Sequence, residues 1–233
     1  MPKGLSPGSV AHRAFCVLVD AGRAKRARGA ILKLEGDETN SVYFVISGWV
    51  LVSKSTGEGQ RQIIDIVTRG GLVDPASADR NISSVEVEPL TDLNYAKLSR
   101  TELARLQREH PEIAGVVDRD RRAAMARIAE RMLRLGKGSA ERRVAFALCE
   151  LCLRSGSLGL EPEHSFHIPM SQQQLGDYTG LSSVHICRTL RRFQRNAICS
   201  VTDHMDVVIH DLDTMMDIAE IDGDVLHRMI ATS

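Results

Sequence analysis

The sequence predicts an α+β fold with an N-terminal antiparallel β domain, a long helix and a C-terminal winged helix-turn-helix. β-rich runs alternate with turn signals from residue 31 to residue 98, as in an antiparallel sandwich or barrel. From about Ser99, apolar residues recur at spacings of three, four and seven, which indicates helices. Farther along, two helix starts separated by a short turn precede two short strands. This order of elements predicts two domains connected by a helix.

The size and composition of the chain agree with two domains. Its 233 residues exceed the commonest domain size of roughly 100 to 150 residues, and 43% hydrophobic and 26% charged residues suit ordinary folded cores. We expect the β domain over residues 1–110, the long helix over 111–136 and the winged domain over 137–233. The longest apolar stretch, residues 42–52, is shorter than the roughly 20 residues of a membrane span. No leader pattern opens the chain, so the expected location is the cytoplasm, without membrane contact.

The cysteines are five in number and scattered, at positions 16, 149, 152, 187 and 199, which is typical of reduced thiols. Cys149 and Cys152 form a CxxC pair inside an apolar helical pattern, with no second ligand pair. A buried structural pair is the favoured interpretation, and redox or metal chemistry is the alternative.

The β domain is expected to use four runs bounded by turn signals. They are AILKLEGD (30–37), VYFVISGWVLVSK (42–54), RQIIDIVTRGG (61–71) and SSVEVEPLTDLNYAKL (83–98).

The long helix is expected to begin at Pro111, because proline fits a first turn, and to end at Gly136. Its apolar positions between Ile113 and Leu135 predict a dimer seam; the plainer alternative is packing on its own domain. Arginines are expected on its other sides, at positions 119, 121, 122, 127, 131 and 134. The sequence GKGS (136–139) is the candidate hinge, and a further helix is expected over about 140–154.

Two capped helices follow a glycine- and proline-rich loop. Ser171 and Gln174 have the spacing of a capping box, and Gly180 can adopt the left-handed conformation that ends a helix. Ser182 repeats the cap, so a second helix begins only about three residues after the first one ends. Such a short connection makes the two helices cross steeply, which predicts a helix-turn-helix.

The second helix has an apolar face and a basic face. Ile186, Leu190, Phe193 and Ala197 share one side, and Val184, Arg188, Arg191 and Arg195 share the opposite side. His185 and Arg192 lie on one flank, and Ser183, Cys187 and Gln194 lie on the other. The chain has a formal net charge of zero, so this concentration of arginine is local.

The last part of the chain predicts a wing and an acidic surface. Residues 197–211 alternate as two short strands around a polar turn, and residues 212–229 form an amphipathic segment. Six acids lie in that region, at positions 211, 213, 217, 220, 222 and 224. They balance the arginines in total charge without lying among them, and they could face solvent or a protein partner.

Several motifs resemble the Crp/Fnr superfamily of bacterial transcription regulators, which includes one of the best-known helix-turn-helix proteins. EGD (35–37), VYFVISGWV (42–50) and RGGL (69–72) are similar to its β-roll sensor domain, which is cyclic-nucleotide-binding-like. The most specific match is MSQQQLGDYTGLSSVHICRTLRRFQ (170–194). The resemblance implies a homodimer that binds double-stranded DNA at an inverted repeat, with RNA polymerase as a candidate partner and no enzyme activity.

The resemblance also implies roles for individual residues. Ser171 and Gln173 correspond to phosphate contacts, and Arg188 corresponds to an arginine that reads guanine. Val184 replaces the glutamate common in relatives and is expected to contact a thymine methyl group instead, beside His185. The full expected DNA-binding set is Ser171, Gln173, Ser182, Ser183, Val184, His185, Arg188, Arg191, Arg192 and Arg195.

The sensor domain departs from cyclic-nucleotide-binding relatives. After Gly71 the chain reads LVDPASADRNISSVEVEP, without the glycine-glutamate pair and with Arg80 as its only arginine, so canonical nucleotide binding is not expected. Cys16 is the only cysteine near the N-terminus, too few for an iron-sulfur cluster. We expect no cofactor, although haem ligation by His12 or another lone histidine stays open. The rival function is a ligand-sensing module that regulates a protein partner through the winged domain.

Cys187, one residue before Arg188, is a candidate redox residue, although the plainer interpretation is a small residue that fills a flank of the helix. Oxidation there would add bulk or negative charge beside bound DNA. If this role is correct, Cys187→Ser removes the sensitivity of DNA binding to peroxide in a mobility-shift assay. Unchanged sensitivity would contradict it.

Overall fold

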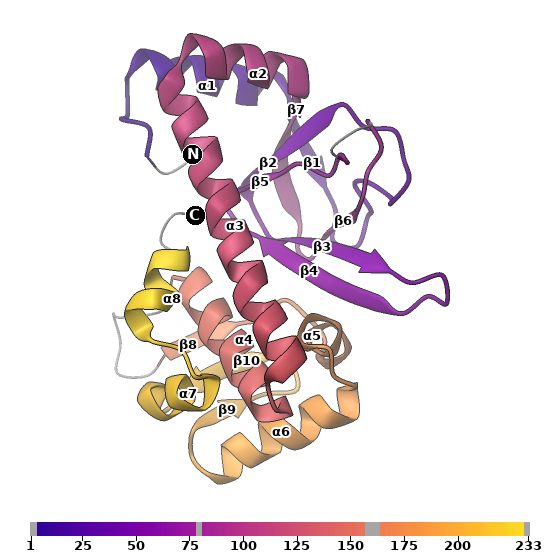
Figure 1. The fold of residues 1–233 in the computed structure, drawn as a ribbon, viewed down its shortest axis with the longest axis vertical. Helices are drawn as coiled ribbons and strands as arrows, with labels where there is room; N and C mark the ends of the chain where they lie inside the picture. Colours follow the sequence, from indigo (N-terminus) through magenta and orange to yellow (C-terminus); the bar gives the residue numbers. More distant parts are fainter. Residues whose placement is uncertain (1–3, 78–80, 157–163, 231–233) are drawn as a thin grey trace. The chain divides into compact units, whose positions relative to one another are not determined.

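The computed structural model describes residues 4–77, 81–156 and 164–230 (Figure 1). The chain divides into two compact units, and the division falls between Ala124 and Met125, inside the longest helix. No helix of the described ranges is both long and apolar enough to cross a membrane.

The first unit is a pair of antiparallel sheets accompanied by helices, as the sequence predicts. Its elements are α1 (Val10–Ala21), β1 (Arg23–Arg26), β2 (Ser41–Ser47), β3 (Val50–Ser55), β4 (Arg61–Val67), β5 (Leu72–Val73), β6 (Glu86–Pro89), β7 (Leu93–Ser99), α2 (Arg100–Glu109) and the start of α3 (Pro111–Lys137). One sheet has the strand order β1-β7-β2-β5 and the other has the order β4-β3-β6. Every strand pair in both sheets is antiparallel.

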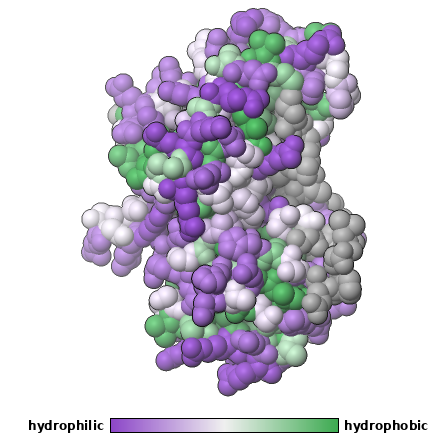
Figure 2. All heavy atoms as spheres, turned by 180° about the vertical axis from the view of Figure 1, so that it is seen from behind, coloured by the Kyte–Doolittle hydropathy of each residue, from purple (hydrophilic) through white to green (hydrophobic). Residues whose placement is uncertain are grey.

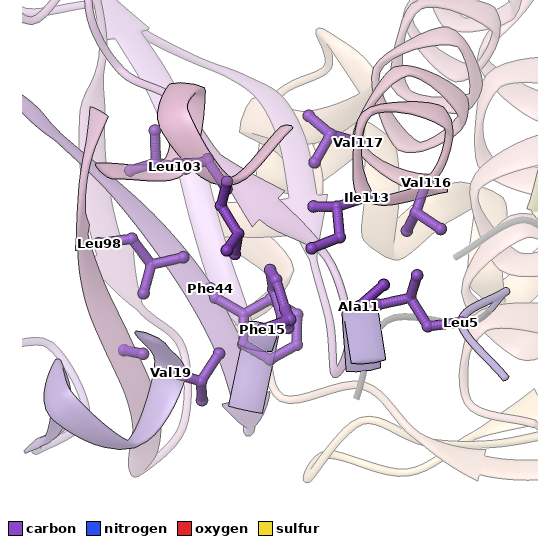
Figure 3. Close-up of a cluster of buried hydrophobic side chains, with 13 residues drawn as sticks. Leu5, Ala11, Phe15, Val19, Phe44, Leu98, Leu103, Ile113, Val116 and Val117 are labelled. Carbon is purple, nitrogen blue, oxygen red and sulfur yellow. The ribbon is translucent and has the colours of Figure 1, made fainter. Parts of the chain in front are cut away.

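β2 is the centre of this unit because both of its faces are buried. Successive side chains of a strand point to opposite sides. Phe44 therefore joins one apolar cluster, where its ring meets that of Phe15 at 5.3 Å and 87° (Figure 3). Tyr43 and Val45 join a second cluster with residues of the facing sheet.

Several features of the first unit differ from the sequence prediction, and one is that β1 lies before the expected runs. The run AILKLEGD contains no strand, because the chain turns there. The Leu34 amide donates to Asp37 Oδ2 (3.2 Å), and Gly36 adopts a positive φ of 88°. Helix α1 was not predicted. Its signals are present, since Ser9 caps it and Phe15 and Val19 follow Ala11 at intervals of four residues on the buried side.

The second unit contains the C-terminal half of α3 and the predicted winged helix-turn-helix. Its other elements are α4 (Ala140–Arg154), β8 (His164–His167), α5 (Gln172–Thr179), α6 (Ser183–Arg195), β9 (Cys199–Val201), β10 (Asp206–Ile209), α7 (Leu212–Ala219) and α8 (Gly223–Ile230). The wing strands β9 and β10 are confirmed, and β8, which was not predicted, completes a sheet of order β8-β10-β9. The expected amphipathic segment is two helices, separated at Glu220, whose φ is 49°.

The end of α3 differs from the prediction, and its C-terminal half shows a burial pattern that the sequence did not predict. The helix ends at Lys137 rather than Gly136, and the Gly138 amide donates to the Arg134 carbonyl (2.7 Å). A Cβ at position 138 would lie 2.7 Å from that carbonyl oxygen, so the glycine that the stop requires is Gly138. Met125 and Met132 are 66% and 67% exposed. The arginines at 127, 131 and 134 are buried instead.

Candidate nucleic-acid interface

The helix-turn-helix begins with the predicted capping box. Ser171 Oγ accepts a hydrogen bond from the Gln174 amide (3.1 Å), and Gln174 Oε1 accepts one from the Ser171 amide (3.0 Å). Met170 and Leu175 are both buried beside it. These reciprocal bonds satisfy two amides that a helix start otherwise leaves without partners, so the start of α5 is well defined.

The turn between α5 and α6 depends on two glycines. Gly180 is left-handed, with φ 66° and ψ 37°, and the Leu181 amide donates to the Gly176 carbonyl (3.0 Å). A Cβ at position 176 would lie 2.4 Å from the Leu181 carbonyl oxygen. The close approach of the turn to α5 therefore requires glycine at 176.

Helix α6 has the two predicted faces, except at its end. Ile186, Leu190 and Phe193 are buried, whereas Val184 is 55% exposed. Ala197, expected on the apolar face, lies beyond the helix end at Arg195, has a φ of 54° and is exposed. The chain has already left the helix there in order to enter β9.

The N-terminal end of α6 presents small and polar groups. Ser182 caps the helix and accepts from the His185 amide (3.4 Å), and its Oγ lies 2.9 Å from His185 Nδ1. Ser182, Val184 and His185 are exposed, and Ser183 is half-buried. Small side chains at a helix end allow close approach to a groove, and the partial positive charge of the helix N-terminus favours an anion.

The exposed arginines of α6 are not equivalent. Arg188, Arg191 and Arg195 line an open concavity together with Gln194. Gln194 was not among the expected contact residues, because helical spacing alone assigned it to a flank. Arg192 instead forms an ion pair with Glu141 at the start of α4. The described part of α6 contains no acid that would neutralise the other three arginines.

Ser171 and Gln173 are exposed at the start of α5, as expected of surface contacts. The Gln173 side-chain amide donates to Asp177 Oδ1 (3.0 Å) on the next turn. Ser171 Oγ uses a lone pair for its cap, so its hydroxyl proton is available to an acceptor in solvent. Figure 2 shows hydrophilic residues along the lower edge of the second unit, the edge at which Figure 1 places α6.

The wing is stabilised by polar contacts of its own. Asp206 Oδ1 lies 2.9 Å from His167 Nδ1, which joins β10 to β8, and Asp206 Oδ2 accepts from the Thr202 hydroxyl (3.2 Å). The hydrogen bond from His167 holds the pKa of the Asp206 carboxyl below its usual value. These contacts link β10 to β8 and close the wing turn.

The cysteines differ in environment. Cys149 and Cys152 are fully buried in α4, and burial raises the pKa of each thiol to about 12. Such thiols stay protonated and unreactive, which agrees with a structural pair. Cys187 is half-buried on α6, so its redox role stays a hypothesis. In the described ranges, no three side chains of metal-binding type come together.

The acidic residues of the C-terminal segment are exposed on α7, on α8 and at their ends, and one of them, Glu220, pairs with Arg142 of α4. They are Asp211, Asp213, Asp217, Glu220, Asp222 and Asp224. In the first unit, the carboxylate of Asp74 follows β5 and pairs with Arg100 (3.5 Å) and Arg121 (3.2 Å). The expectation about Arg80 concerns a residue outside the described ranges.

The fold and the site together define a class of proteins in which a winged helix-turn-helix with a basic second helix follows an antiparallel β domain. Two family models match, the cyclic nucleotide-binding domain over residues 24–110 and the Crp-like helix-turn-helix domain over 126–218. The nitrogen fixation regulation protein FixK of Azorhizobium caulinodans is 26% identical over 91% of this chain and 84% of its own length. The fumarate and nitrate reduction regulatory protein of Vibrio cholerae is 28% identical over 81% and 75%.

The solved structure of FixK2 from Bradyrhizobium japonicum has the same fold, with a TM-score of 0.75, 20% identity and coverage of 86% of this chain and 98% of that one. The chain belongs to the Crp/Fnr family of transcription regulators. This is a family of regulators rather than of enzymes, and the fold class expected from the sequence is confirmed.

The tight turn gives a prediction. Gly176→Ala is expected to lower the free energy of unfolding by about 1 to 3 kcal/mol, because the new methyl group overlaps the Leu181 carbonyl. Urea denaturation followed by circular dichroism measures the change. Gly223→Ala is the matched control, since its Cβ would meet its nearest atom, Met216 Sδ, at an ordinary 3.5 Å. Equal stability of the two variants would contradict this role of Gly176.

Proposed function

We propose that this regulator is a homodimer that binds an inverted-repeat DNA site through the exposed face of α6. The observation that carries the proposal is the set of Arg188, Arg191 and Arg195, exposed on one side of a helix whose other side is buried. In helix-turn-helix proteins the second helix enters the major groove. Two copies related by a two-fold axis would read half-sites about one helical turn apart.

Base reading is assigned to the N-terminal part of α6. Arg188 would donate two hydrogen bonds to O6 and N7 of a guanine. Val184 lies one turn earlier, and its exposed side chain has no acceptor for cytosine N4, so it fits a thymine methyl group. Ser182, Ser183 and His185 would contact neighbouring base edges or phosphates.

Phosphate contacts are assigned to the surrounding polar groups. Arg191 and Arg195 extend the basic face beyond the reading end, and Ser171 and Gln173 lie exposed at the start of α5. Arg192 would contribute less, because Glu141 already pairs with it. Such contacts position the helix without reading sequence, and they make affinity fall with salt.

The dimer seam is assigned to the exposed side of α3. Met125, Met132 and Leu133 are 66%, 67% and 57% exposed, and Ala129 and Gly136 are exposed beside them. Met125, Ala129, Met132 and Gly136 alternate at spacings of four and three, the heptad pattern of packed helices. Residues 111–136 would thus connect a sensor over 1–110 to a DNA-binding domain over 137–233.

The sensor is proposed to respond to something other than a cyclic nucleotide. The sequence after Gly71 lacks the glycine-glutamate pair that holds ribose in nucleotide-binding relatives. The Asp74 carboxylate there pairs with Arg100 and Arg121, so either arginine would give up an existing ion pair in order to hold a cyclic phosphate.

The reading role of Arg188 can be tested on DNA. Sites selected by the wild-type protein from a random duplex library would serve as probes, with scrambled duplexes as the reference. Arg188→Ala is expected to lose about 1 to 3 kcal/mol of discrimination at one symmetric base pair. Arg195→Ala is the comparison variant. It is expected to weaken binding to selected and scrambled duplexes by the same factor, and to make affinity depend less steeply on salt concentration. Wild-type discrimination in Arg188→Ala would refute the assignment.

The seam can be tested by sedimentation. Met132→Glu would place an unpaired charge in the contact on both copies, so the dimer dissociation constant is expected to rise by about 100-fold or more. Met132→Leu, which keeps an apolar side chain of similar size, is expected to retain the dimer. A dimer of unchanged strength in Met132→Glu would rule out this side of α3 as the interface.

The acidic surface of α7 and α8 favours one rival function. Exposed carboxylates of a single sign would suit a basic protein partner, with the winged domain as an interaction surface. Absence of DNA binding by the wild-type protein even at low salt would favour this rival over the proposal.

A further inference from the structure

One buried carboxylate connects three helices of the second unit. Glu150 of α4 has no exposed surface. Its Oε1 accepts a hydrogen bond from Arg154 Nη1 (3.3 Å) on the same helix. From α3, Arg127 Nε lies 4.0 Å from Oε1 and Arg131 Nε lies 3.9 Å from Oε2. All three arginine side chains are at least nine-tenths buried.

Tyr178 brings the helix-turn-helix into this cluster. It lies on α5 and is 2% exposed. Its hydroxyl donates to Glu150 Oε2 (2.8 Å), and the Arg131 guanidinium lies 4.6 Å from the centre of its ring. The first helix of the pair is therefore connected to α3 and α4 at a single carboxylate.

A third arginine of α3, Arg134, contacts the end of α7. The Arg134 guanidinium lies 4.0 Å from the centre of the Phe146 ring, and it donates to the carbonyls of Ala219 (2.9 Å) and Glu220 (3.0 Å). These carbonyls end α7, where a cation is favourable. Polar contacts thus attach α3 to α4, α5 and α7.

The geometry of α3 places these arginines opposite the proposed seam. At 100° per residue, Arg131 and Met132 lie about 100° apart, and Arg127 and Met125 about 160° apart, around the helix axis. The burial pattern agrees, since the methionines are exposed and the arginines are not. One helix therefore carries the dimer contact on one side and the attachment of the helix-turn-helix on another.

We propose that Tyr178 and Glu150 are positioning residues: they fix the angle of α5 and α6 on the dimer helix, and so determine which half-site spacing the dimer accepts. This inference rests on the proposed function. Hydrogen bonds to a carboxylate have narrow angular preferences, whereas apolar contact is non-directional. Without the Tyr178 hydroxyl, α5 could settle at neighbouring angles on α3 and α4.

The experiment compares two buried hydroxyls on the same helix. Tyr178→Phe removes the bond to Glu150 and keeps the ring beside Arg131. Thr179→Val is the matched control, because within the part of the chain that the structure describes the buried Thr179 hydroxyl donates within α5 alone, to the Leu175 carbonyl (2.8 Å) and the Gly176 carbonyl (3.4 Å). The probes are a duplex selected by the wild-type dimer and the same duplex with one base pair inserted or deleted between its half-sites.

The readout is the dissociation constant for the duplex with altered spacing divided by that for the selected duplex. A loss of stability alone lowers the amount of folded protein for both probes equally, so it does not change this ratio. In Tyr178→Phe this ratio is expected to fall by about threefold or more. A tenfold change corresponds to about 1.4 kcal/mol, so a threefold change corresponds to about half that free energy. In Thr179→Val it is expected to stay at the wild-type value. An unchanged ratio in Tyr178→Phe, or an equal fall in both variants, would overturn the positioning role alone. Equal binding of selected and scrambled duplexes by wild type would overturn the proposed function itself.

Discussion

The packing of helices in the second unit depends on a buried carboxylate, that of Glu150, and on the buried arginines around it. A carboxylate without solvent contact is stable only when cations and hydrogen-bond donors surround it closely. Glu150 meets that condition through arginines of α3 and α4 and the hydroxyl of Tyr178. Because each partner comes from a defined place on its helix, the requirement fixes how those helices meet. The exposed face of α6 then has a defined direction relative to α3.

The first unit fixes the packing of its elements through apolar contacts instead of buried charges. Its central strand β2 is buried on both sides, so the alternation of side chains sends Phe44 toward the helices and Tyr43 toward the facing sheet. The members of these two clusters are hydrophobic residues. The two halves of α3 consequently have different chemistry: Ile113, Val116 and Val117 pack in an apolar core, whereas buried arginines attach the C-terminal half.

Local signals in the sequence were sufficient for much of the fold and for the shape of the interface. The caps at Ser171 and Ser182 and the glycine at 180 act through neighbouring residues, so their spacing predicted α5, α6 and the turn between them. Burial of Arg127 and Arg131 could not be predicted in this way, because it depends on Glu150, which arrives from another helix. The strand predicted around Leu34 was wrong. Apolar alternation suggested a strand, but Asp37 and Gly36 form a turn there. The roles of the DNA-binding residues came from the family resemblance and stay proposals.

The ion pair between Arg192 and Glu141 has a consequence for how this surface would respond to its surroundings. The carboxylate is already a counterion, held by the protein itself. A phosphate that approached Arg192 would also approach the Glu141 carboxylate, and the two negative charges would repel each other. Helix α6 would therefore behave in salt as though it carried one arginine fewer on each copy than the sequence contains. Glu141 would thereby moderate attraction to DNA of any sequence while leaving Arg188 unaffected.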